Sequence, residues 1–74
     1  MSTQPQPPTY ELQKYDWAAK TWKTAGTYDT ETDHRAEGNA FYAYEQHALY
    51  GPCRLLKDGN TALGNDDPNA YYAA

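Results

Sequence analysis

Three side chains in this sequence could act as soft metal ligands, or as a nucleophile and its base: His34, His47 and Cys53. The separations of thirteen and six residues match none of the ligand spacings of a closed zinc site. Cys53 and His47 could pair as nucleophile and base, but no pattern supplies an oxyanion site or a third, orienting group. We therefore predict no catalytic residue, no metal site and no cofactor, and we interpret Cys53 as a small buried apolar side chain.

Carboxylates at alternating positions, Asp29, Glu31 and Asp33, resemble the first ligands of a calcium-binding loop. Such a loop needs glycine at its sixth position, where this chain has His34, and a glutamate at its twelfth, which is missing. The chain also lacks a glycine-rich phosphate loop, a GxSxG motif and an HExxH motif. We interpret the acidic run as the start of a helix, because carboxylates favour the positive end of the helix dipole.

The main predicted helix runs from about residue 29 to residue 50. Its apolar side chains recur every three or four residues, which indicates one buried face. This face comprises Ala36, Ala40, Ala43 and His47, with Phe41, Tyr44 and Ala48 alongside. Gly51 and Pro52 are typical of a helix end. Gly38 interrupts the pattern, and it indicates either a close helix crossing or a later start.

A second predicted helix covers about residues 10 to 25 and ends at Gly26. Its helical spacing rests on Leu12, Tyr15, Ala18, Ala19 and Trp22. Lys20 and Lys23 near its end would lie close to the acidic start of the main helix, which favours an antiparallel two-helix hairpin. The chain contains no valine and no isoleucine, which argues against a sheet. We therefore predict a mainly α fold.

The remaining segments suggest three parts: an extended Pro/Gln-rich arm over residues 1–9, a helical-hairpin body over 10–63, and an extended C-terminal arm with tyrosine anchors over 64–74. Residues 53–63 could form either of two structures. Asp58-Gly59 predicts the turn of a small β-hairpin, which we favour, while Pro52 could instead begin a helical turn.

Composition limits the class of function. The 74 residues make one small domain, in which eight tyrosines, two tryptophans and one phenylalanine take the place of aliphatic side chains. A net charge of −4 gives no basic field, so we expect no direct contact with nucleic acid. No apolar run approaches the roughly 20 residues of a membrane span. Because Cys53 is alone, we expect a cytoplasmic protein, or one within a virion or complex assembled in the cytoplasm.

A two-helix body of this size could not bury all of its aromatic side chains, and aromatic side chains are enriched at binding hot spots. We predict that partner proteins contact Trp17, Tyr42, Tyr50, Tyr71 and Tyr72. The expected function is that of a non-enzymatic, small structural or accessory subunit, by analogy with parts of bacteriophage particles and multi-subunit complexes. The alternative is a small acidic inhibitor that binds and blocks a host enzyme.

Overall fold

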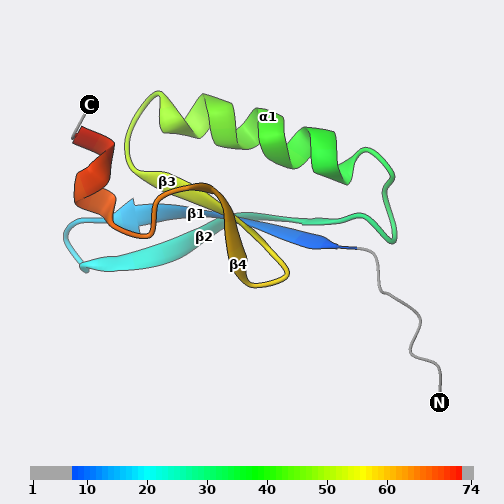
Figure 1. Ribbon diagram of the computed structural model, residues 1–74, viewed down its shortest axis with the longest axis horizontal. Coiled ribbons are helices and arrows are strands. Elements are labelled where there is room, and N and C mark those ends of the chain that lie inside the picture. Colours follow the sequence, from blue (N-terminus) through cyan, green and yellow to red (C-terminus); the bar gives the residue numbers. More distant parts are fainter. Residues whose placement is uncertain (1–7, 73–74) are drawn as a thin grey trace, which may run out of the picture.

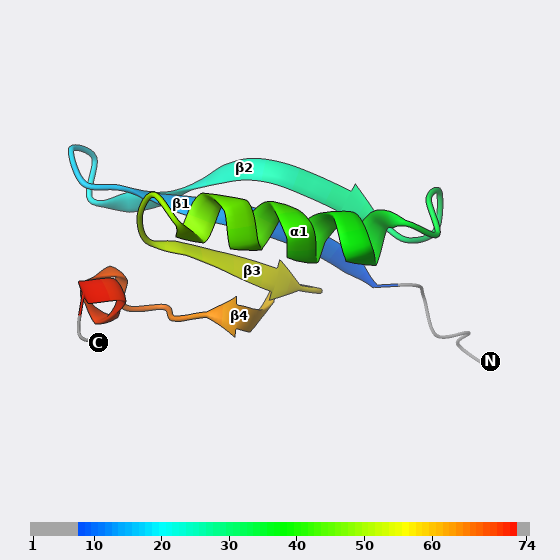
Figure 2. The same ribbon diagram turned by 90° about the horizontal axis from the view of Figure 1, so that it is seen from above.

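The computed structural model describes residues 8–72, and Figures 1 and 2 show a sheet with a helix lying across one of its faces. Within these residues the chain forms a four-stranded antiparallel sheet in the order β2-β1-β3-β4. The elements are β1 (Thr9–Asp16), β2 (Thr21–Asp29), α1 (Ala36–Ala48), β3 (Cys53–Lys57), β4 (Asn60–Gly64) and the 3₁₀ helix η1 (Pro68–Tyr72). The prediction of a mainly α, two-helix hairpin is therefore wrong.

The segment predicted as a helix over residues 10–25 is a β-hairpin made of β1 and β2. Tyr10 and Leu12 are buried while the residue between them is less so, which is the alternation of a strand with one covered face. The connecting turn is built by Asp16, whose Oδ1 accepts from the backbone N–H groups of Ala18 and Ala19 at 3.0 and 3.1 Å. A turn of this kind replaces the continuous helix that the alanines suggested.

The main helix is shorter than predicted, since α1 begins at Ala36 and ends at Ala48. The residues before it form a loop in which Asp29 and Asp33 each accept a backbone N–H two residues on, at 2.9 Å. These carboxylates favour local turns over helix. A Cβ at Gly38 would have nothing within 4 Å, so this glycine marks no close helix crossing.

The turn predicted at Asp58-Gly59 is confirmed as the two-residue connection of the β3–β4 hairpin. Both residues have positive φ, 51° and 85°, as a type I′ turn requires. The C-terminal arm predicted as extended is wrong over Pro68–Tyr72, which is helical. Of the N-terminal arm, residues 1–7 lie outside the described residues, and Thr9 already belongs to β1.

The core lies between α1 and the two central strands. Leu12 of β1 and Leu55 of β3 are directly opposite one another, and both are completely buried. Ala40 of α1 packs in the same cluster, together with Tyr10 and Cys53. Burying a leucine side chain contributes about 1.5 to 3 kcal/mol, so these two leucines supply much of the aliphatic stabilisation.

The face of the sheet away from α1 carries polar side chains joined by hydrogen bonds across all four strands. Glu11 accepts from Thr24 and from Gln13, Gln13 accepts from Nε of Arg54, and Arg54 and Thr61 both bond Asp66. The hydrogen bond from Thr24, followed by that from Gln13, lowers the pKa of Glu11. The polar side chains of this open face are therefore linked to one another by hydrogen bonds from β2 to β4.

Two glycines give a matched pair of stability predictions. Gly38→Ala should stabilise the protein by about 0.5 to 1 kcal/mol, because the site is exposed, helical and open. Gly64→Ala should destabilise it by about 1 to 3 kcal/mol, because φ is +89° and a Cβ would lie 2.6 Å from the Cys53 carbonyl oxygen. Urea unfolding followed by circular dichroism measures both. A Gly64→Ala variant as stable as the wild type would contradict the described β3–β4 geometry.

A buried hydroxyl predicts how stability changes at alkaline pH. Tyr10 donates from its hydroxyl to Oε2 of Glu37 at 2.7 Å, and this hydrogen bond, together with burial, raises the pKa of Tyr10 to about 12. The folded state thus holds the proton more tightly than the unfolded chain, where the pKa is about 10. The stabilisation is complete below about pH 10 and is lost as pH rises towards 12.

The measurement is the free energy of unfolding of wild type and Tyr10→Phe between pH 8 and pH 12, where phenylalanine keeps the ring but cannot ionise. The difference between the two proteins should change in favour of the variant above about pH 10. A constant difference over this range would show that the hydroxyl does not link α1 to β1 as described.

Candidate protein-interaction surface

The side chains considered for catalysis or metal binding lie in unrelated environments. His34 is exposed in the β2–α1 loop, His47 is half-buried in the last turn of α1, and Cys53 is buried at the start of β3. Between residues 8 and 72, no group of three or more His, Cys, Asp or Glu side chains is placed to hold a metal ion.

Cys53 is held in a structural role. Its Sγ donates to the backbone oxygen of Tyr44 at 3.7 Å, and burial raises the pKa of the thiol. A nucleophilic cysteine needs the opposite, a lowered pKa that favours the thiolate. The geometry therefore matches a packed, protonated side chain between β3 and α1.

The outer side of α1 and the two residues that follow it carry the most exposed large apolar side chains of the described residues. Tyr42 is 65% exposed, Leu49 69% and Tyr50 86%. Tyr42 and Leu49 are seven residues apart, which places them on one side of the helix, and Tyr50 follows directly. We call these three residues the helix stripe.

Negative charge is concentrated in the same layer. Residues 29–50 hold five carboxylates against one basic side chain, Arg35, whereas the rest of the chain holds five of each sign. The whole net charge of −4 therefore belongs to α1 and the segment before it, from the last residue of β2 onward. Glu37 and Glu45 are exposed on α1 itself, so the helix stripe lies in an acidic surrounding.

The five residues predicted to contact partners are divided by the structure. Tyr42 and Tyr50 belong to the helix stripe, while Tyr71 of η1 donates from its hydroxyl to the backbone oxygen of Ala48 at 2.8 Å, beside the end of α1. Trp17, 45% exposed, lies in the β1–β2 turn, where its ring meets Tyr15 edge to face at 4.7 Å. The side chain of Tyr72 lies outside the described residues.

Sequence reasoning missed Leu49 as a surface residue, although its spacing from Tyr42 was a usable signal. It also missed the aromatic part of the open sheet face. There Tyr15 meets the ring of Trp22 at 5.2 Å, and the Arg54 guanidinium lies over Trp22 at 4.4 Å. Tyr15 and Trp22 are neighbours because β1 pairs with β2, and Arg54 joins them because β3 pairs with β1 on the other side.

Comparison with known proteins gives no relative, since no family model, curated protein or solved structure matches the chain. Within the part of the chain that the structure describes, no helix has both the length and the apolar character needed to cross a membrane.

The structural role of Cys53 predicts slow thiol chemistry. In the native protein at pH 8, Cys53 should react with an aromatic disulfide reagent at least about tenfold more slowly than in 6 M guanidinium chloride, because burial protects it and disfavours the thiolate. Absorbance of the released thiolate gives the rate. Reaction as fast in the native state as in the unfolded one would instead indicate an accessible thiol.

Proposed function

We propose that this chain is a non-enzymatic binding subunit that docks onto another protein through the helix stripe. The observation that carries this proposal is the high exposure of three large apolar side chains, Tyr42 on α1 and Leu49 and Tyr50 directly after its last turn. Single exposed apolar side chains are ordinary, but several on one element, two of them tyrosines, are typical of a binding surface.

Charge indicates the kind of partner. Two copies of this chain would bring together two layers of net charge −4, and this repulsion disfavours a symmetric dimer through the stripe. A partner with an apolar groove rimmed by lysine or arginine would complement both the apolar side chains of the helix stripe and the negative charge around them. We therefore propose a basic protein partner in a larger assembly located in the cytoplasm, or in a virion or complex assembled there.

The alternative, an acidic inhibitor that blocks a host enzyme, would use Asp29, Glu31, Asp33 and Glu37. Three of these carboxylates already bond groups of their own chain: Asp29 and Asp33 accept backbone N–H groups, and Glu37 accepts from Tyr10. Their structural use favours the accessory-subunit proposal, in which apolar contact provides most of the affinity.

The test compares Tyr42→Ser/Tyr50→Ser with Leu63→Ser, a control at an exposed apolar residue of β4. A protein retained by the immobilised wild-type chain from the source cells is identified, purified and titrated calorimetrically against all three. The stripe variant should weaken Kd by at least about 30-fold, near 2 kcal/mol, because both rings lose their contact area. The control should change Kd by less than about threefold.

Circular dichroism should show that both variants keep the wild-type fold, because the substituted side chains are substantially exposed. Equal affinity of the stripe variant and the wild type would contradict the proposal. If the purified partner is an enzyme and loses activity when bound, the inhibitor alternative is favoured instead.

A further inference from the structure

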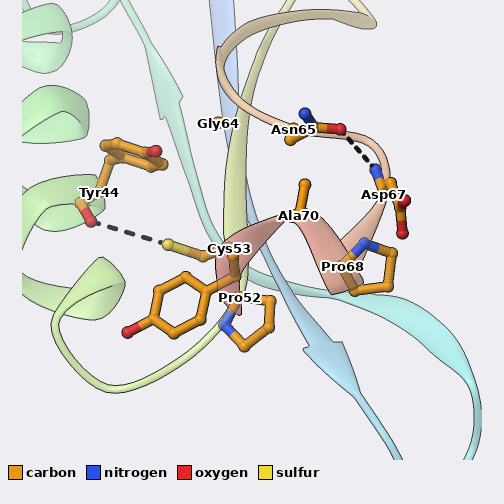
Figure 3. Close-up of a pocket in the computed structure, with 9 residues that line it drawn as sticks. Tyr44, Pro52, Cys53, Gly64, Asn65, Asp67, Pro68 and Ala70 are labelled. Atoms are coloured by element: carbon orange, nitrogen blue, oxygen red, sulfur yellow. Dashed lines mark hydrogen bonds between the residues drawn. The ribbon is translucent and has the colours of Figure 1, made fainter. Parts of the chain in front are cut away.

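A pocket lies at the C-terminal end of α1, between that helix, the start of β3 and η1. Its volume is about 150 Å³, and its apolar lining consists of Tyr44, Pro52, Cys53, Pro68, Ala70 and Tyr71. In the view of Figure 3, Tyr44 lies on one side and Pro68 on the other, with Pro52 and Cys53 between them. A cavity of about this size is large enough to accept a benzene ring, and so one large apolar side chain.

The walls of the pocket are fixed by hydrogen bonds within the chain. Tyr71 is tied to α1 through the Ala48 oxygen, and Cys53 through the Tyr44 oxygen. The segment leading into η1 is held by Asn65 Oδ1, which accepts from the Asp67 N–H at 2.8 Å. A pocket built in advance in this way loses little conformational entropy when it is filled.

One side of the pocket is charged. Asp67 lines it, and its Oδ1 accepts the Asn69 N–H at 3.0 Å. Of the two ion pairs within residues 8–72, neither includes Asp67. The C-terminal end of α1 adds the negative end of the helix dipole, so a cation beside the pocket would be favoured.

We infer that this pocket receives a single leucine, methionine or phenylalanine side chain from the partner, next to a lysine or arginine that pairs with Asp67. The apolar lining and the volume fit one large apolar side chain of the partner, and the Asp67 carboxylate fits a basic residue next to it. The inference rests on the proposed function and adds a second contact beside the helix stripe, where Tyr71 meets the end of α1.

The probes are acetylated, amidated tripeptides titrated into the ¹⁵N-labelled protein and followed by NMR. Lys-Phe-Lys should give saturable shifts at the amides of Cys53, Asn65 and Ala70. Lys-Ala-Lys should bind at least about tenfold more weakly because it lacks the anchor. Glu-Phe-Glu should bind at least about fivefold more weakly because its charge repels Asp67.

Ala70→Trp should fill the pocket and weaken Lys-Phe-Lys binding by at least about tenfold, whereas Ala25→Trp, at an exposed site on β2, should leave it within about twofold. No saturable shift at about 10 mM Lys-Phe-Lys, or equal binding of Lys-Ala-Lys, would overturn the inference. This comparison uses the wild-type protein, so it does not depend on the folding of Ala70→Trp.

The two proposals fail separately. Tyr42→Ser/Tyr50→Ser should bind Lys-Phe-Lys like the wild type, because neither residue lines the pocket. If that variant loses the protein partner while the wild type ignores the tripeptide, the pocket inference alone is wrong. If the tripeptide binds in the pocket while the stripe variant keeps full affinity for the partner, the stripe proposal alone is wrong.

Discussion

The packing of Leu12 against Leu55 under α1 is the contact on which the rest of this fold depends. The two residues face each other on the central strands, so the same pair joins the two hairpins and supports the helix. Small side chains at Ala36 and Ala40 are buried against the sheet and allow α1 to approach closely. The chain has few aliphatic residues, and two of its leucines form the centre of the core. Tyrosine side chains pack around this centre.

Because aliphatic residues are few, only one face of the sheet is covered by an apolar core. One face has the helix, and the other is occupied by hydrogen-bonded polar groups with the Arg54–Trp22 contact at one end. Tyrosine occurs both in the core and on the surface. Tyr10 is buried with its hydroxyl bonded to Glu37, while the ring of Tyr42 is exposed to solvent. Residue type alone therefore does not separate the core from the exposed surface in this protein.

The sequence predicted the middle of α1 and the Asp58-Gly59 turn, because helical spacing and turn chemistry are local. It misassigned residues 10–25, where Leu12, Tyr15 and Trp22 recur at helical spacing although the two strands place Leu12 in the core and the two aromatic residues on the open face. The sheet was excluded because valine and isoleucine are absent, whereas β2 is built with threonines and Asp16 forms the turn before it. The exposure of Tyr42 and Tyr50 followed from a surplus of aromatics. The pocket could not be predicted, because its walls come from α1, β3 and η1, which meet only in the folded chain.

Irregular pairing on both outer strands limits how this protein can assemble. The register shifts once between β1 and β2, at Leu12/Gln13, and once between β3 and β4, at Leu55/Leu56. Bulges of this kind twist an edge strand and interrupt the row of backbone groups that a further strand would need. Growth of the sheet from copy to copy is thereby discouraged, even though both outer strands have a free edge in the described residues.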